Sequence, residues 1–329
     1  MTTRHVVLLT YGEPPVPDYF AQLRYSWRIL LGLTRTVAPI PLPLLPMIAL
    51  SRARLRTSLW RAEHYRSPLE PITEEQAGEL ARVLTAREPG ATWRVKVAYE
   101  FRDPLLTHVL DEVPASEPVD VIPMYVADSA FTHALSRTTL ETWLRKRFPT
   151  GRPAPARVMP PLNEELFAEL SANHVLDELA NQGVRPDGTW ALMLAAHGTL
   201  LEPPRPYETG RLATERVCAG IAQRLAPHFG MVANGWLNHV YGGRWTAPPA
   251  DVALRAISEA GYRRVVYYPY GFMADNAETQ LEGRVALRGE PALEPVHLLC
   301  MNESVALLEA LATQLTGQPA MTRQGAAAR

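Results

Sequence analysis

Residues 263–282 read RRVVYYPYGFMADNAETQLE, and this stretch decides the fold. Its first part, residues 263–270, is apolar with many β-branched and aromatic side chains, which predicts a buried strand of a parallel sheet. Gly271 ends that pattern, and a polar segment with Glu278 and Glu282 follows. Because these acids are four residues apart, a helix would turn both carboxylates to one side. Such acids lie where open α/β sheets bind ligands, although a solvated first helical turn also favours them.

Length and composition limit the classes of protein to which the chain belongs. Its 329 residues suffice for two domains of ordinary size, and a net charge of -1 gives no reason to expect nucleic acid as a partner. Cys218 and Cys300 lie far apart in apolar surroundings, which indicates buried thiols in a reducing compartment. The first residues lack a signal-peptide pattern, so we expect a cytoplasmic protein. We expect residues 319–329 to be a disordered tail.

Strands and helices alternate along both halves of the chain. The apolar runs predict strands at residues 6–11, 93–99, 119–125, 190–196, 231 onward and 295–300, and helices at 139–148, 163–180, 212–225, 251–260 and 304–315. A capping box of Thr73 and Gln76 predicts one more helix start, and Asp251 predicts another. Alternation of this kind favours parallel sheets with right-handed crossovers. We therefore predict two α/β domains, residues 1–172 and 173–318, with strand tips that face each other across a cleft.

The segment ILLGLTRTVAPIPLPLLPMIALSRARL, residues 29–55, has the most unusual composition, and we call it the apolar lip. Pro39, Pro41, Pro43 and Pro46 argue against a regular helix in it, and also against a membrane span, whose backbone must satisfy its own hydrogen bonds. With arginines on both flanks, it fits an exposed surface for a flat apolar ligand or a membrane interface. A buried irregular loop is the alternative interpretation.

Few residues outside residues 263–282 suggest chemistry by themselves. The sequence has no glycine-rich phosphate loop, no Cys or His pair with zinc spacing and no G-x-S-x-G elbow. Of its nine histidines, His197 stands at a predicted strand tip, directly after the apolar run of residues 190–196. Tyr11 also ends a predicted strand, where it is either a site residue or a core aromatic that caps the sheet.

Several motifs in order resemble the ferrochelatase family. YPYGFMADNAETQLE resembles the family pattern Pro-x-Gly-Phe-x-x-Asp-His-x-Glu-Thr-Leu-x-Glu, and ALMLAAHG resembles a strand followed by Ser-Ala-His-Gly. WRAEHYRSPLEPITEEQA, WLNHVYGGRWTAPPAD and LLTYGEPP resemble three further family segments, so the similarity runs from about residue 6 to residue 315. It implies two Rossmann-like domains of the chelatase type, each a parallel sheet flanked by helices. It also implies an enzyme that inserts Fe(II) into protoporphyrin IX or coproporphyrin III in haem biosynthesis.

The resemblance also implies roles for single residues. His197 and Glu278 would be the catalytic pair and, with Glu282, would handle the metal. An imidazole is a good Fe(II) ligand, and a buried carboxylate with a raised pKa accepts protons at neutral pH. The residues expected to contact the porphyrin are Tyr11, Ser67, Tyr125, Trp236, Trp245 and Asn276. The apolar lip would cover the macrocycle, and it argues for an apolar porphyrin, whereas Tyr11 is typical of the branch that acts on coproporphyrin.

The chain departs from the family pattern around these residues. Asn276 replaces a histidine and Arg284 replaces an acid beyond the second glutamate. The other departures are Tyr65 and Arg66 for two glycines, Ala195 for a serine, Leu237-Asn238 for Gln-Ser, and Phe101 where some relatives carry His or Tyr. We therefore keep two alternatives: a non-catalytic porphyrin- or haem-binding homologue, and a cobalt or nickel chelatase for another tetrapyrrole.

The resemblance sets expectations for cofactors and partners too. Fe(II) is a substrate, no cofactor is permanently bound, and two cysteines are too few for a [2Fe–2S] cluster in one chain. The expected partners are a porphyrin and ferrous iron. We add peripheral contact with the inner face of the membrane through the apolar lip, and transient contact with neighbouring haem-pathway enzymes.

Overall fold

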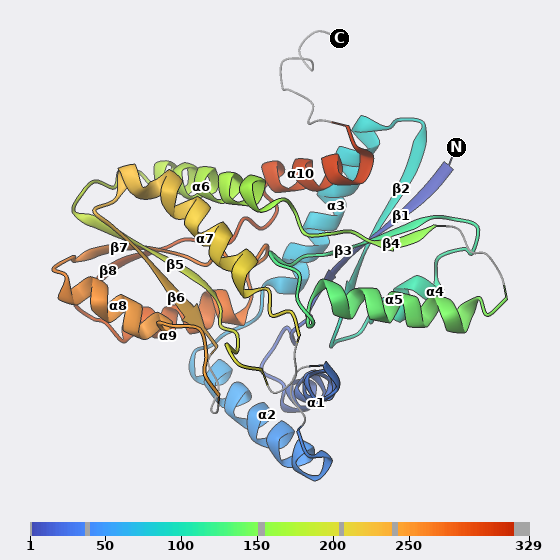
Figure 1. The fold of residues 1–329 in the computed structure, drawn as a ribbon, viewed down its shortest axis with the longest axis horizontal. Helices are drawn as coiled ribbons and strands as arrows, with labels where there is room; N and C mark the ends of the chain where they lie inside the picture. The colour runs from blue at the N-terminus through green and yellow to red at the C-terminus, as the bar shows by residue number, and fades with distance from the viewer. Residues whose placement is uncertain (1, 37–39, 151–154, 204–206, 239–242, 319–329) are drawn as a thin grey trace, which may run out of the picture.

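The computed structural model describes residues 2–36, 40–150, 155–203, 207–238 and 243–318. Pro39 of the apolar lip and the predicted tail, residues 319–329, lie outside the described residues. Figure 1 shows two sheet-containing halves side by side, with two helices projecting below them on the side away from the termini.

Each half contains one four-stranded parallel sheet, as the apolar runs predict. The first sheet has the order β2-β1-β3-β4 and the second the order β6-β5-β7-β8. The strands are β1 (Thr2–Thr10), β2 (Ala91–Tyr99), β3 (Val119–Pro123), β4 (Ala156–Val158), β5 (Trp190–His197), β6 (Met231–Leu237), β7 (Arg264–Tyr268) and β8 (Glu294–His297). The central strands β1, β5 and β7 are almost fully buried, which explains their continuous apolar sequences.

Helices connect the strands and flank the sheets. They are α1 (Tyr19–Thr36), α2 (Leu45–Ala62), α3 (Leu69–Arg87), α4 (Leu106–Asp111), α5 (His133–Arg147), α6 (Glu164–Asn181), α7 (Arg211–Leu225), α8 (Ala250–Glu259), α9 (Gly283–Arg288) and α10 (Val305–Thr316). Short 3₁₀ segments occur at η1 (Leu42–Leu44) and η2 (Ala226–His228), and η3 (Ala277–Glu282) is a π-helix that leads into α9. The fold is thus the predicted α/β architecture, with one parallel sheet flanked by helices in each half.

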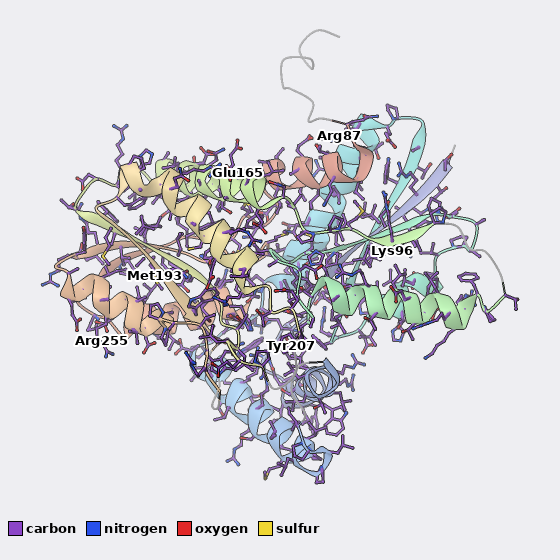
Figure 2. All side chains as sticks on the ribbon, in the orientation of Figure 1. Arg87, Lys96, Glu165, Met193, Tyr207 and Arg255 are labelled. Atoms are coloured by element: carbon purple, nitrogen blue, oxygen red, sulfur yellow. The ribbon has the colours of Figure 1, made fainter. Side chains whose placement is uncertain are left out.

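A single apolar core joins the two halves. It includes Leu8 of β1, Leu80 of α3, Leu192 of β5 and Leu311 of α10. At the end of α3, Arg87 donates to the Glu309 backbone oxygen (3.0 Å) and to its carboxylate on α10, and Figure 2 shows this residue beside α10. The predicted domain boundary between residues 172 and 173 falls within helix α6, and it stays a prediction.

The prediction that the prolines of the apolar lip exclude a regular helix holds for the described connection with Pro41 and Pro43, but it is wrong on either side, where α1 and α2 extend into the lip. The described part of the lip comprises the end of α1, the 3₁₀ segment η1 and the start of α2, and α1 packs against α2. Pro41 and Pro43 lie in the connection, and Pro46 lies in the first turn of α2, where no intrahelical amide donor is needed. Among the described residues no helix is both long and apolar enough to cross a membrane.

Two predicted helix starts are also wrong. Helix α3 begins at Leu69, and Thr73 lies inside it with its hydroxyl donating to the Leu69 carbonyl (2.5 Å), so Thr73 and Gln76 form no capping box. Helix α8 begins after Pro249, so Asp251 lies in its first turn and is not its N-cap. In both cases a proline, Pro68 or Pro249, stands at the N-cap position instead, without a side-chain cap hydrogen bond.

Candidate active site

Two of the predicted site residues stand at the carboxyl ends of central strands. Tyr11 directly follows β1, and His197 is the last residue of β5. Gly271, past the end of β7, lies against β5, where a Cβ atom would come within 2.8 Å of Ala196 Cα. Only glycine permits this approach without displacement, and it brings the 271–282 segment beside His197.

The π-helix η3 positions the predicted acids. Asn276 caps it, since its side-chain oxygen accepts from the amides of Glu278 (2.9 Å) and Thr279 (3.3 Å), while the Thr279 hydroxyl accepts from the Asn276 amide (3.0 Å). The Thr279 hydroxyl donates to the buried carboxylate of Asp275 (2.8 Å). Asn276, which replaces the histidine of the family pattern, is therefore the residue that begins the helix carrying Glu278.

His197 and Glu278 form an ion pair across the site. His197 Nδ1 lies 2.8 and 2.9 Å from the two Glu278 carboxylate oxygens, and the amide of Asn238 donates to the second oxygen at 3.3 Å. The His197 side chain is 45% exposed and that of Glu278 12%, so the imidazole faces an open space and the carboxylate lies behind it. Burial opposes the imidazolium, but Glu278 outweighs it, and the pKa of His197 is raised.

Glu282 is a second acid with a shifted proton affinity. Burial, and then the nearby charge of Glu278, raise its pKa to about 7, whereas Arg56, His197 and Arg52 act in the opposite direction. A carboxyl group with this pKa exchanges its proton near neutral pH.

Aromatic side chains build the wall opposite the ion pair. The ring of Tyr11 lies 5.7 Å from that of Phe101, 4.6 Å from that of Tyr125 and 5.9 Å from that of Phe131. The Tyr11 hydroxyl donates to the Phe131 carbonyl (3.2 Å), and burial raises the pKa of Tyr11, so this phenol stays neutral. Flat aromatic faces of this kind suit a flat conjugated ligand.

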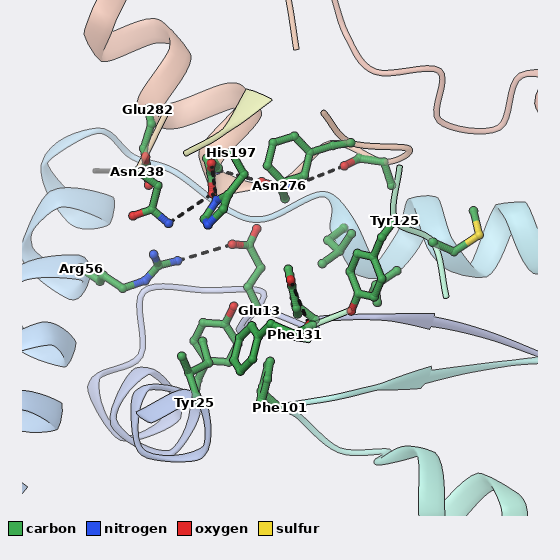
Figure 3. Close-up of a pocket in the computed structure, with 18 of the residues that line it drawn as sticks. Glu13, Tyr25, Arg56, Phe101, Tyr125, Phe131, His197, Asn238, Asn276 and Glu282 are labelled. Carbon is green, nitrogen blue, oxygen red and sulfur yellow. Dashed lines mark hydrogen bonds and ion pairs between the residues drawn. The ribbon is translucent and has the colours of Figure 1, made fainter. Parts of the chain in front are cut away.

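One pocket joins the ion pair, the acids and the aromatic wall, as Figure 3 shows. Its lining comes from both halves of the chain and includes seven of the predicted site residues: Tyr11, Tyr125, His197, Trp245, Asn276, Glu278 and Glu282. Two predicted site residues do not line it. Ser67 is buried and donates to Glu13, and Trp236 is buried in the shared core.

Four polar side chains that line the pocket were not among the predicted site residues: Glu13, Arg52, Arg56 and Asn238. Arg52 and Arg56 lie on α2, one turn apart, which a search for helical i, i+4 pairs would have found. The Glu13 carboxylate is 6% exposed and lies 3.5 Å from Arg56. Asn238 has a φ of 55°, and it replaces the family's serine.

One ring nitrogen of His197 is not engaged by Glu278. His197 presents Nδ1 to Glu278, so Nε2 is the ring nitrogen left for a metal or a pyrrole N–H. No group of three or more His, Cys, Asp or Glu side chains with metal-holding geometry occurs in the part of the chain that the structure describes. His197, Glu278 and Glu282 line the same pocket.

Comparisons with known proteins concern the chain as a whole. The family model described as Ferrochelatase matches residues 4–316. The chain is 25% identical to the ferrochelatase of Rhodobacter capsulatus, over 95% of this chain and 92% of that one, and 26% identical to the ferrochelatase of Phenylobacterium zucineum (strain HLK1), over 98% and 92%. The solved structure of CbiX, described as the terminal enzyme for biosynthesis of sirohaem in denitrifying bacteria, has a TM-score of 0.52 at 17% identity, covering 97% of this chain and all of that one. This last likeness concerns the fold alone.

Proposed function

The chain belongs to the ferrochelatase family and is a metal chelatase of tetrapyrrole synthesis, and we propose that it inserts Fe(II) into a porphyrin, protoporphyrin IX or coproporphyrin III. The observation that carries the proposal is the His197–Glu278 pair, held opposite a wall of aromatic rings in one pocket. The pair offers an imidazole for ferrous iron and a carboxylate for protons, and the rings suit a flat macrocycle.

The reaction exchanges one Fe(II) for two pyrrole protons, and the site has a group for each step. The Nε2 atom of His197 binds the incoming metal or accepts a pyrrole proton. Glu278 orients the imidazole ring through its contact with Nδ1. Glu282, with a pKa of about 7, takes up a departing proton and releases it near neutral pH. We therefore assign catalysis to His197 and Glu278, and proton or metal transfer to Glu282.

Two arginines in the pocket favour a substrate that carries carboxylate groups. Arg52 and Arg56 line the pocket from α2, and Arg52 Nε is buried without a hydrogen-bond partner among the described residues. A buried, unsatisfied guanidinium is costly, and a bound carboxylate would satisfy it with charge-assisted hydrogen bonds. Porphyrin propionates supply such carboxylates. The aromatic residues Tyr11, Tyr125 and Trp245, with Asn276, would then contact the macrocycle itself.

We also propose that the α1–α2 hairpin meets the membrane surface at the inner face. Large apolar side chains of this hairpin are exposed: Phe20 (73%), Leu42 (69%), Met47 (62%) and Leu55 (68%). Arg54 and Arg61 on α2 are exposed beside them, and basic residues next to apolar ones favour an anionic lipid surface. Because Arg52 and Arg56 of the same helix line the pocket, an apolar porphyrin would enter directly from that surface.

The first test is anaerobic insertion of Fe(II), followed by the change in porphyrin absorbance, with protoporphyrin IX and coproporphyrin III assayed side by side. Turnover of either porphyrin is the expected result, and the faster one identifies the substrate. Tight binding of both without turnover would refute the proposal and support a non-catalytic porphyrin-binding protein. Turnover with Co(II) or Ni(II) and another tetrapyrrole, and none with Fe(II), would support the third alternative.

A further inference from the structure

Glu13 is a buried carboxylate in the pocket to which the proposed chemistry assigns no role. It lies two residues after Tyr11, in the loop that follows β1, and is 6% exposed. Figure 3 shows it between Arg56 on one side and the aromatic residues Tyr25 and Phe131 on the other. A buried carboxylate is retained at a cost in desolvation, so its partners indicate what it does.

The partners of Glu13 come from three separate segments. Its Oε1 accepts from the Ser67 hydroxyl (2.5 Å) and from the backbone amide of Ala277 (2.8 Å), and its Oε2 lies 3.5 Å from the Arg56 guanidinium. Ser67 is itself fixed, because its amide donates to the Pro15 carbonyl (3.0 Å) and its hydroxyl accepts from the Leu69 amide (3.2 Å) at the start of α3. Glu13 therefore links the loop after β1 and the start of α3 to Ala277, which lies 264 positions later in the chain.

The contact with Ala277 is the one that concerns catalysis. Ala277 is the first residue of η3, and Glu278 follows it directly. On the other side of the same helix, Asp275 accepts from the Thr279 hydroxyl (2.8 Å) and from the Asn302 amide (2.7 Å). The start of η3 is thus held from the second half of the chain by Asp275 and Asn276, and from the first half by Glu13. The Glu13 contact links the loop after Tyr11, a residue of the aromatic wall, directly to the backbone next to Glu278.

We propose that Glu13 is a positioning residue that fixes Glu278 against His197 and sets the distance between this pair and the aromatic wall on the first half of the chain. This inference deepens the proposed chelatase function and rests on it. Glu13 acts through the Ala277 amide and not on the substrate, because Oε1 is engaged with Ser67 and Ala277 and Oε2 faces Arg56. Small displacements of reacting groups are costly: a shift of about 1 Å can lower a rate about 100-fold.

Two variants separate the hydrogen bonds of Glu13 from its charge. Glu13→Gln keeps an oxygen that accepts from Ser67 and Ala277, so we expect its kcat to stay within about 3-fold of the wild type. Glu13→Ala removes every contact, and we expect kcat to fall about 10- to 100-fold while KM for the porphyrin changes by less than about 3-fold. Asp120→Asn is the matched control, because Asp120 is also 6% exposed and paired with an arginine, on β3 beside β4 (Arg157 Nε at 2.6 Å).

Hydrogen exchange of the amides in residues 276–282 tests the same inference without activity. We expect faster exchange in Glu13→Ala, near-wild-type exchange in Glu13→Gln and no change there in Asp120→Asn. Unaltered kcat in Glu13→Ala, a loss confined to KM, or unaltered exchange in residues 276–282 would overturn the inference. A wild-type protein without any insertion activity would refute the proposed function alone, and the exchange of residues 276–282 would still decide the role of Glu13.

Discussion

His197 gives the sharpest prediction for a single residue. Replacing it with alanine removes the imidazole that faces the pocket but leaves the aromatic wall and the arginines in place. We expect His197→Ala to lose metal insertion by about 1000-fold or more, while porphyrin quenching titrations give a Kd within a few-fold of the wild type. Circular dichroism checks that His197→Ala is folded to the same extent as the wild type before the two are compared. Substantial turnover by His197→Ala would remove His197 from the catalytic pair.

Glu282 gives a prediction about pH. Its pKa of about 7 in the folded protein is above the ordinary value of 4.5, so the folded state binds more protons than the unfolded state between these pH values. Stability from this group is therefore present below about pH 4.5 and is lost as pH rises through 7. Glu282→Gln cannot ionise, so we expect its stability relative to the wild type to increase by about 1 to 3 kcal/mol between pH 5 and pH 8.

Chemical denaturation of the two proteins at several pH values measures this difference. Glu303→Gln serves as the control, because Glu303 is an exposed acid outside the pocket. A difference between Glu282→Gln and the wild type that stays constant from pH 5 to pH 8 would contradict the raised pKa of Glu282.

Several residues that depart from the family pattern make specific contacts in or near the site. Asn276 caps η3, Asn238 donates to Glu278, and the Arg284 guanidinium lies 5.9 Å from the centre of the Tyr65 ring. Phe101 stacks on Tyr11. Replacements that make specific contacts around an intact His–Glu pair are expected of a working enzyme with altered surroundings. They do not resemble the loosened pocket expected of a protein that has lost catalysis.

At the level of secondary structure, Gly271 lets the 271–282 segment pack closely against β5. A methyl group there would come within 2.8 Å of Ala196 Cα, directly before His197. We expect Gly271→Ala to lower stability by about 1 to 3 kcal/mol and to reduce kcat as well, because either β5 or the 271–282 segment must move. Gly78→Ala is the control: nothing lies within 4 Å of the added methyl on α3, so stability should rise by about 0.5 to 1 kcal/mol.

Thermal and urea unfolding of both variants, with the insertion assay, checks this prediction. Equal kcat for Gly271→Ala and the wild type would show that the strand tip tolerates the added methyl group.

Strands were predictable from the sequence because buried parallel strands have continuous apolar runs, as at residues 190–196 and 263–270. The helices of the apolar lip were not, because the rule that proline breaks helices applies to helix interiors, and Pro46 lies in a first turn. The π-helix η3 was expected only as a helix, since i, i+4 acids do not distinguish the two types.

The site was predictable to the extent that its residues lie at strand tips or in a family motif. His197, Glu278 and Glu282 meet in one pocket, as the alternation of strands and helices indicates. Glu13 and Asn238 were not predictable, because their contacts with Ala277 and Glu278 depend on how distant segments pack. Trp236 and Ser67 lie in the expected segments, but the burial of their side chains becomes visible only in the fold.

At the scale of the whole molecule, the hairpin of α1 and α2 carries exposed apolar side chains, and other residues of both helices line the pocket. Met47, Leu55 and Leu59 are exposed on α2, at spacings of eight and four residues that place them on one side of the helix. Burying each side chain in a lipid interface would contribute on the order of 1 kcal/mol, and the exposed Arg54 and Arg61 would add attraction to anionic lipids. The hairpin therefore gives a prediction about membrane binding.

We expect the wild-type protein to co-sediment with vesicles that contain anionic lipid, and to do so less at high salt because screening weakens the arginine contribution. The triple variant Met47→Ser, Leu55→Ser, Leu59→Ser should lose most of this binding without losing stability, because all three side chains are exposed in the folded protein. Leu212→Ser on α7, also exposed, is the matched control and should bind as the wild type does. If the triple variant also keeps wild-type vesicle binding, the hairpin is not the contact. If instead it loses kcat with a porphyrin presented in detergent, the hairpin's apolar residues serve the substrate directly and not the membrane.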